Sequence, residues 1–207
     1  KPIRRGIAPM QHLNLSQDAG LLAATEYAQA HDDDPGHGVQ VARLAVRLFA
    51  ATRELHGLGA ADERLLVAAA LLHDLGWPVR PEAHHKGARD LILGIPLRGF
   101  SEEERGMIAC LARYHRKAHP SDRHKVYRDL NAPARDKVRK LAAILRIADG
   151  LDRTHAATVK TLETSRDGRT LTISVEQAPR SAIDLMGAQR KKDLFEAVFG
   201  VDVVIRG

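Results

Sequence analysis

The segment from Ala68 to Trp77, AAALLHDLGW, constrains the fold of this chain more than any other. It begins as a run of helix-forming apolar residues, which predicts a helix in the core of a bundle. The run ends in two polar side chains that commonly bind metals, His73 and Asp74, and Gly76 and Pro78 prevent the helix from continuing. The pair is therefore either hydrogen-bonded within the core or part of a metal site.

Helical periodicity recurs through the first three quarters of the chain. Aromatic residues make up only 4% of the sequence, so the core must consist mainly of Leu, Ala, Val and Ile, which favours helices over a β-sandwich. Ser16 is a candidate N-cap with Asp18 in the first turn, Asp34 is another candidate cap, and Ser101 with Glu104 forms a capping box. The predicted helices cover residues 16–31, 37–57, 60–76, 82–93, 101–117 and 134–155.

The period changes after His155 from helical to alternating. The segments TVKTLET and TLTISVE flank Asp167-Gly168, which is a hairpin signal. A last helix over 181–199 and a strand in VDVVIR complete the chain. The predicted fold class is mainly α, a bundle of six or seven helices with a small C-terminal antiparallel β-unit.

The predicted organisation is a single domain with a small appendage. Residues 1–15 carry no clear periodicity and predict a flexible N-terminal arm. Residues 16–156 would form the helical domain, and residues 157–207 an extension of hairpin, helix and strand packed on it.

Composition narrows the class of protein and of partner. One cysteine, Cys110, excludes an internal disulfide and suits a reducing cytoplasm, and no segment has the roughly 18 apolar residues of a membrane span. A net charge of +6 favours an anionic partner such as a phosphate or a nucleotide. A nucleic acid is not expected, because no RNA-binding signature or aromatic stacking platform accompanies the charge.

Four residues on three predicted helices form a candidate metal site. His37 and His73 are 36 residues apart, which fits a helix, a turn and a second helix that returns antiparallel, and Asp149 lies near the end of another long helix. A bundle can bring His37, His73, Asp74 and Asp149 to one point. Mixed imidazole and carboxylate ligands suit one or two divalent ions among Mn, Fe, Ni, Co, Zn and Mg.

A second metal would use further histidines. His85 and His115 are the natural ligands, with Asp74 as a bridge, and a metal-bound hydroxide would be the nucleophile. His85 is preferred to His84 because adjacent positions on a helix differ in direction by about 100°. Asp74 and His115, together with Lys86, are the candidate catalytic residues.

Each of these residues has a plainer interpretation. Asp149 could pair with Arg146 or Arg153, and we expect Asp152 to pair with a neighbouring arginine and hold the helix end. The segments KVYRDL and AQRKKD are interpreted as charged surface faces. No site role is expected for six other histidines, His12, His31, His56, His119, His124 and His155.

His37, the His-Asp pair and Asp149, in this order and on helices, resemble the HD-domain superfamily of metal-dependent phosphohydrolases. Several longer segments resemble the C-terminal HD-like domain of the Ppx/GppA exopolyphosphatase/pppGpp phosphatase family over roughly Leu22–Arg206. These segments are HGVQVARLAVRLF, LLVAAALLHDLGW, HHKGARDLI, FSEEERGMIACLARYHRK and LAAILRIADGLDRTH. In that family the polyphosphate chemistry belongs to actin-like N-terminal domains, to which nothing in this chain is similar.

The resemblance implies an HD fold and the possibility of a metal site. We expect a phosphohydrolase that acts on a small phosphorylated anion, a nucleotide or another phosphate ester or anhydride. Its candidate phosphate-binding residues are Lys86, Arg116, Lys117 and Arg153. The alternative is a non-catalytic module that binds phosphate or dimerises in support of a Ppx/GppA-type phosphatase, and the sequence leaves a homodimer open.

Overall fold

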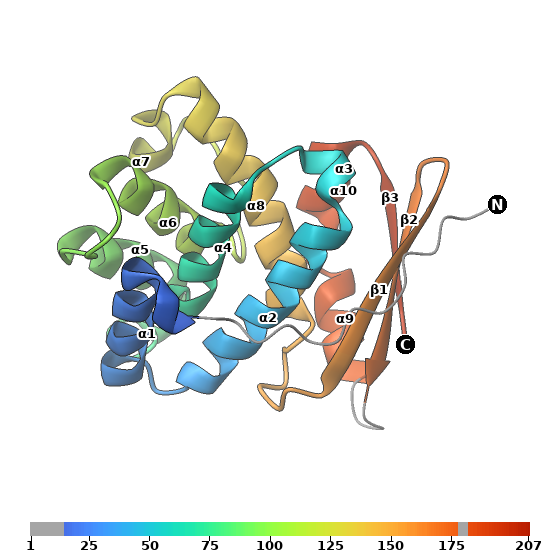
Figure 1. Ribbon diagram of the computed structural model, residues 1–207, viewed down its shortest axis with the longest axis horizontal. Coiled ribbons are helices and arrows are strands. Elements are labelled where there is room, and N and C mark those ends of the chain that lie inside the picture. Colours follow the sequence, from blue (N-terminus) through green and yellow to red (C-terminus); the bar gives the residue numbers. More distant parts are fainter. Residues whose placement is uncertain (1–14, 178–181) are drawn as a thin grey trace.

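The computed structural model describes residues 15–177 and 182–207, in which helices surround a long central helix and a small sheet covers one side (Figure 1). The predicted N-terminal arm, apart from Leu15, lies outside the described residues. The helical part contains η1 (Leu15–Gln17), α1 (Ala19–His31), α2 (Pro35–Ala51), α3 (Arg53–His56), α4 (Ala60–Leu72), η2 (Pro81–Ala83), α5 (His84–Gly94), α6 (Glu102–Tyr114), α7 (Lys125–Arg128) and α8 (Ala132–Gly150). The C-terminal part contains β1 (Val159–Asp167), β2 (Thr170–Gln177), α9 (Ala182–Gln189), α10 (Asp193–Phe199) and β3 (Asp202–Arg206). The predicted fold class, mainly α with a small C-terminal β-unit, is confirmed.

Helix α8 is the centre of the molecule. It contacts α2, α4 and α6 in the helical part and α9 and α10 in the C-terminal part. All residues from Leu141 to Gly150 are buried, as expected of a helix surrounded by other elements. Helix α4 is buried in the same way from Leu65 to Leu72, and the chain leaves the helix at His73 in a series of turns. Among the described residues, no helix is both long enough and apolar enough to cross a bilayer.

Helix boundaries differ from the sequence prediction at several points. Asp18, not Ser16, caps α1 and accepts hydrogen bonds from the backbone of Gly20 and Leu21 at 2.8 and 2.9 Å, because η1 carries the chain through residue 16. The predicted helix over 37–57 is interrupted at Thr52, whose hydroxyl donates to the Leu48 carbonyl at 2.6 Å. The caps at Asp34 and at Ser101 with Glu104 are confirmed.

The two predicted C-terminal helical segments are also shorter than expected. Helix α8 ends at Gly150 instead of continuing to residue 155, and turns follow it. The last helix is two helices, α9 and α10, separated by a turn over residues 190–192.

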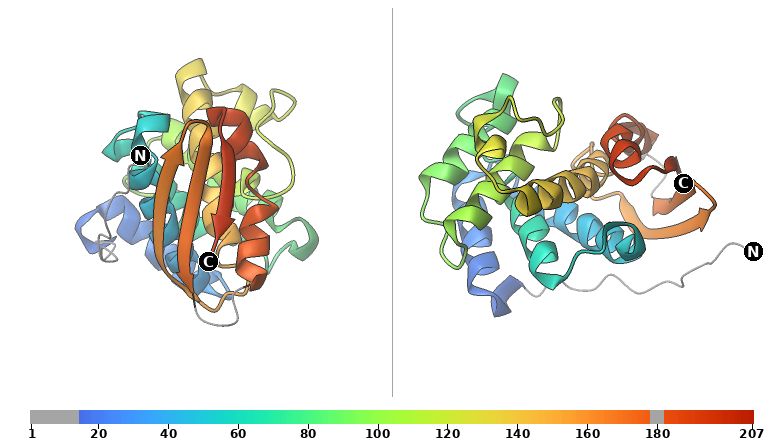
Figure 2. Two further views of the ribbon diagram at one scale, coloured as in Figure 1. Left: turned by 90° about the vertical axis from the view of Figure 1, so that its right-hand side faces the viewer. Right: turned by 90° about the horizontal axis from the view of Figure 1, so that it is seen from above.

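The sheet has the order β1-β2-β3 and is mixed. Strands β1 and β2 form the predicted antiparallel hairpin around Asp167–Thr170. Strand β3, expected to be antiparallel, pairs with β2 in parallel, because the crossover through α9 and α10 returns the chain to the end where β2 began. Buried and exposed residues alternate along β3. One face of the sheet therefore packs on the helices, and the other face points outward (Figure 2).

Helices α8 and α9 approach each other at two glycines. A Cβ atom on Gly187 would lie 2.5 Å from the Gly150 carbonyl oxygen and 2.9 Å from Cβ of Arg153, so neither helix can carry a larger residue here without moving. The fully buried carboxylate of Asp184 fastens the start of α9 to the loop after α8, because it accepts from the Thr154 amide at 2.8 Å.

Gly187→Ala tests this close approach. Alanine in a helix is ordinarily more stable than glycine, yet here we expect a loss of roughly 1–3 kcal/mol in the free energy of unfolding, because the methyl group overlaps backbone atoms of α8. Urea unfolding measures the change. Gly94→Ala is the matched control, since no atom lies within 4 Å of the added Cβ. A Gly187→Ala protein as stable as the control would contradict this packing.

Candidate metal centre

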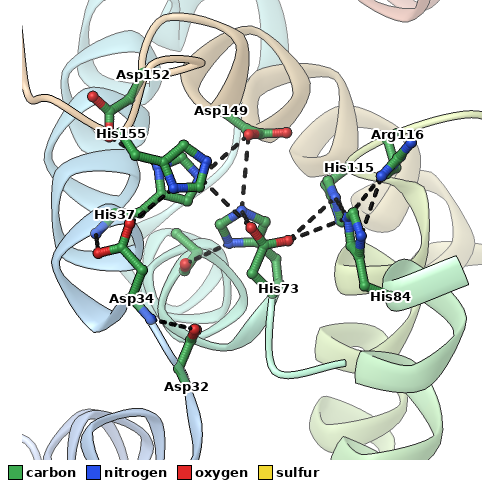
Figure 3. A network of polar contacts seen from close by, with 12 residues as sticks. Asp32, Asp34, His37, His73, His84, His115, Arg116, Asp149, Asp152 and His155 are labelled. Atoms are coloured by element: carbon green, nitrogen blue, oxygen red, sulfur yellow. Dashed lines mark hydrogen bonds and ion pairs between the residues drawn. The ribbon is translucent and has the colours of Figure 1, made fainter. Parts of the chain in front are cut away.

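Six buried side chains from five segments meet where α2, α4, α5, α6 and α8 begin or end. Figure 3 shows the histidines and Asp149 turned toward a common centre. The set comprises His37 of α2, His73 and Asp74 after α4, His84 of α5, His115 after α6 and Asp149 of α8.

The four residues predicted to hold the first metal lie together. Nε2 of His37 is 3.5 Å from Oδ1 of Asp149, and Nε2 of His73 is 3.9 Å from the same oxygen. Oδ2 of Asp74 lies 3.8 Å from Nε2 of His37 and 3.6 Å from Nε2 of His73.

The second oxygen of Asp74 faces a different pair of histidines. Oδ1 lies 3.4 Å from Nε2 of His84 and 3.6 Å from Nε2 of His115. The carboxylate of Asp74 is therefore placed between two groups of nitrogen atoms. This arrangement is suited to bridging two cations.

Local backbone geometry aims these histidines. Nδ1 of His73, His84 and His115 each lies within hydrogen-bond distance of the carbonyl three residues earlier, at 2.8, 3.2 and 2.6 Å. Nδ1 of His37 is 2.8 Å from Oδ2 of the buried Asp152. With Nδ1–H as the donor, a neutral ring keeps its lone pair on Nε2, the nitrogen that faces the centre.

The donor atoms fit a divalent cation. Nε2 of His37, Nε2 of His73 and Oδ1 of Asp74 are buried without a hydrogen-bond partner among the described residues, which is costly unless a cation satisfies them. Ligands about 2.1 Å from a tetrahedral zinc ion are about 3.4 Å apart, at the lower end of the nitrogen–oxygen separations of 3.4 to 3.9 Å in the cluster. Three groups have ligand atoms within 4.8 Å of one another: His37, His73 and Asp74; His73, His115 and Asp149; Asp74, His84 and His115.

The cluster is rich in negative charge. Burial disfavours charge on His37, but its contacts with Asp149 and Asp152 outweigh burial and raise its pKa to about 10. Burial likewise opposes ionisation of Asp74, but the neighbouring His73 and His115 lower its pKa to about 2. Burial is the largest influence on His115 and holds its pKa well below the usual value. Without a metal, Asp74 is thus ionised and His37 is protonated.

The predicted phosphate-binding residues lie at different distances from this cluster. Nη1 of Arg116 is 3.0 Å from Nε2 of His84, and Nζ of Lys117 donates to the Glu82 carbonyl at 3.2 Å, at the rim. Lys86 and Arg153 are exposed, and within the described part of the chain neither forms a hydrogen bond or ion pair with the cluster. The structure therefore brings Arg116 to the site and leaves Lys86, a candidate catalytic residue, outside it.

The structure brings His84, and not His85, to the cluster. Helix α5 begins at His84, and the step of about 100° per residue directs the following ring elsewhere. His85 is buried and belongs to none of the three ligand groups found among the described residues. Burial, reinforced by Arg113 and Arg116, lowers its pKa to about 4, so it is a neutral core histidine. The position of His84 beside Asp74 depends on Gly76. A Cβ atom on Gly76 would lie 2.0 Å from the His84 carbonyl oxygen, so a larger residue here would push the start of α5 away.

Sequence reasoning missed three further residues of the site. Asp152 was expected to pair with an arginine, but its carboxylate lies against His37. Its position one helical turn after Asp149 could have indicated that it faces the same cluster. His155 stacks on the His37 ring with centroids 3.7 Å apart, and its Nδ1 lies 2.9 Å from Asp34. Lys191, in the segment AQRKKD, donates a short hydrogen bond to Oδ2 of Asp149. No local pattern indicates this last contact.

The thiol is not part of the site. Burial raises the pKa of Cys110 to about 12, and this cysteine lies in the hydrophobic core. A thiolate ligand is therefore not available from it, and the donors are imidazole nitrogens and carboxylate oxygens. Such a set favours Mn, Fe, Co, Ni or Zn.

Comparison with known proteins agrees with this architecture. The family model described as Ppx/GppA phosphatase, domain III, matches residues 22–192. A guanosine-5'-triphosphate,3'-diphosphate pyrophosphatase from Pseudoalteromonas atlantica (strain T6c / ATCC BAA-1087) is 26% identical over 148 residues, which are 70% of this chain and 29% of that protein. The chain thus matches less than a third of the length of this curated relative. It belongs to the Ppx/GppA phosphatase family, and the part of the family that it matches is domain III.

Proposed function

We propose that this chain is a metal-dependent phosphohydrolase of the HD type, which hydrolyses a nucleotide or another phosphate ester or anhydride. One observation carries the proposal: the two oxygens of Asp74 face two separate pairs of histidines, His37 with His73 and His84 with His115. The name of the relative, a pyrophosphatase, supports hydrolysis of a phosphorylated substrate.

The residues divide into two ligand sets that share Asp74. His37, His73, Asp149 and Oδ2 of Asp74 would hold one cation, and His84, His115 and Oδ1 of Asp74 the other. His115 also lies close to His73 and Asp149, so the two sets are adjacent. Bound divalent cations supply Lewis acidity and lower the pKa of a coordinated water. Asp152 fixes the ring of His37, and Arg116 and Lys117 provide positive charge for phosphate oxygens at the rim.

A second candidate is a non-catalytic module that binds phosphate or dimerises. Two findings favour this candidate. The matching family model is domain III of the Ppx/GppA phosphatases, and the chain aligns with only 29% of the length of the pyrophosphatase. Metal content and turnover distinguish the two candidates. A chain that binds metal but turns over no phosphate ester would be the binding module.

The metal content of the purified protein tests the two proposed ligand sets. After incubation with Mn²⁺ and gel filtration, plasma mass spectrometry should find about two equivalents in the wild type, as a two-metal site requires. Asp74→Asn should lose both, and His84→Gln should lose one. His85→Gln is the matched control, because its ring is adjacent in sequence and outside the ligand groups, and it should retain both. Loss of metal in His85→Gln with retention in His84→Gln would contradict the assignment.

Asp152 lies behind His37, with its carboxylate against Nδ1 of the ring. Asp152→Asn should weaken Mn²⁺ binding by about 10–100-fold, because an outer carboxylate orients its histidine and increases its basicity. Hydrolysis of p-nitrophenyl phosphate by the Mn²⁺-loaded protein should fall by a similar factor. Titration calorimetry and a colorimetric assay measure the two effects. Unchanged affinity in a folded variant would remove Asp152 from the site.

The affinity for metal should depend on pH, because His37 is a proposed ligand. The pKa of His37 is raised from 6.5 to about 10 in the folded protein, so protonation of His37 stabilises the metal-free fold fully below pH 6.5 and this stabilisation is lost as pH rises through 10. A cation must displace that proton, so affinity should rise about tenfold per pH unit between pH 6.5 and 8.5. Calorimetry in buffers of different ionisation enthalpy should detect release of one proton. A flat affinity across this range would be inconsistent with the protonation of His37.

A further inference from the structure

Lys191 carries a positive charge into the metal centre from the C-terminal part of the chain. It lies in the turn between α9 and α10, and its Nζ donates to Oδ2 of Asp149. The other oxygen of Asp149 faces His37 and His73. The carboxylate is 9% exposed and the lysine side chain 20%, so this ion pair is shielded from solvent on most sides. Although burial opposes it, Lys191 holds the pKa of Asp149 well below the usual range.

Contacts on both sides fix the turn that presents Lys191. The close approach of Gly187 to Gly150 holds the end of α9 against α8, and the amide of Lys191 donates to the Ala188 carbonyl at 3.0 Å. After the turn, Asp193 accepts a hydrogen bond at 3.0 Å from Arg146, a buried residue of α8. The backbone is therefore held in place, whereas the lysine side chain is a flexible stem that can redirect its ammonium group.

Lys191 and a divalent cation at Asp149 would repel each other. Both would lie within a few ångströms of one carboxylate in a buried site, where like charges interact strongly. The second ligand group has a similar arrangement, because Nη1 of Arg116 lies 3.0 Å from Nε2 of His84. In each group, a basic side chain thus occupies a ligand of the proposed cation.

We propose that Lys191 is an exchangeable counter-cation: it neutralises Asp149 while no divalent cation is bound, leaves Asp149 when the cation enters, and then binds a phosphate oxygen of the substrate. The inference rests on the proposed function for the cation and the phosphate. Displaced from Asp149, the ammonium group would stay beside the centre, because the backbone of the turn is held on both sides, and it would then be free to pair with an anionic phosphate oxygen. The lysine therefore opposes metal binding and favours phosphate binding.

These two effects have opposite signs, which gives a sharp test. Lys191→Met keeps the apolar stem and removes the charge. It should bind Mn²⁺ about tenfold more tightly than the wild type, and the Mn²⁺-loaded variant should bind methylphosphonate about tenfold more weakly, each a change worth about 1.4 kcal/mol. Titration calorimetry at fixed pH measures both affinities, and circular dichroism checks that the fold is intact.

Two variants serve as controls. Lys192→Met removes the adjacent lysine, whose Nζ contacts the Val203 carbonyl and Glu196 instead of the site, and both affinities should stay at wild-type values. Lys191→Arg retains the charge and should keep both affinities close to those of the wild type.

The outcomes distinguish the proposed role of Lys191 from the proposed metal-dependent function. If the wild type binds Mn²⁺ and Lys191→Met binds it equally or more weakly, the ion pair is structural and the inference is overturned while the proposed function stands. If only the methylphosphonate affinity is unchanged, the phosphate-binding half is overturned. If the wild type binds no Mn²⁺ but Lys191→Met does, Lys191 excludes the cation, and the proposed function fails for the natural sequence. If neither binds Mn²⁺, both ideas are overturned.

Discussion

Three carboxylates of the candidate metal centre are buried in the core, and neighbouring groups must compensate their negative charge. Asp74, Asp149 and Asp152 lie within a core of leucine and alanine, where unpaired negative charge is expensive. A protonated His37 and the ammonium group of Lys191 balance part of this charge in the metal-free protein. Oδ1 of Asp74 still has no hydrogen-bond partner among the described residues. Burying so many potential metal-ligand atoms together would destabilise the fold if nothing were bound to them. This cost is why we propose that a cation binds between them.

The C-terminal part of the chain is a component of this centre as well as an appendage. The sheet covers one side of the bundle, but α9 packs directly on α8 through paired glycines and leads into the turn that carries Lys191. The extension predicted from the change in periodicity therefore contributes a side chain to the cluster at the end of α8.

Most of the site was predictable because its ligands follow helix signals. His73 and Asp74 end an apolar run, His37 follows the cap at Asp34, and Asp149 and His115 lie at the ends of long periodic segments. Helix ends in a bundle meet at common points, so residue type and spacing were sufficient for these five. The choice between His84 and His85 was different, because it depends on the rotational phase of a helix that starts after the short turn η2. Sequence periodicity does not determine that phase.

Contacts between segments far apart in the sequence could not be predicted from local sequence patterns. Lys191 and Asp149 are 42 residues apart, and their meeting depends on the packing of α9 against α8. The parallel pairing of β3 likewise depends on the path of the chain through α9 and α10, whereas the hairpin of β1 and β2 follows from Asp167-Gly168 alone. Ser16 was a plausible cap by residue type, but the short helix η1 occupies residues 15–17, so the N-cap of α1 is Asp18.

The proposed function requires that the Asp74 carboxylate bridge two cations. A crystal structure of the Mn²⁺-loaded protein, with data collected on both sides of the manganese absorption edge, would locate them. We expect two anomalous peaks about 3.5–4 Å apart on either side of the Asp74 carboxylate, one beside His37, His73 and Asp149 and the other beside His84 and His115. A single peak, a peak remote from Asp74, or Lys191 still bound to Asp149 with no peak beside it would rule out this two-metal site.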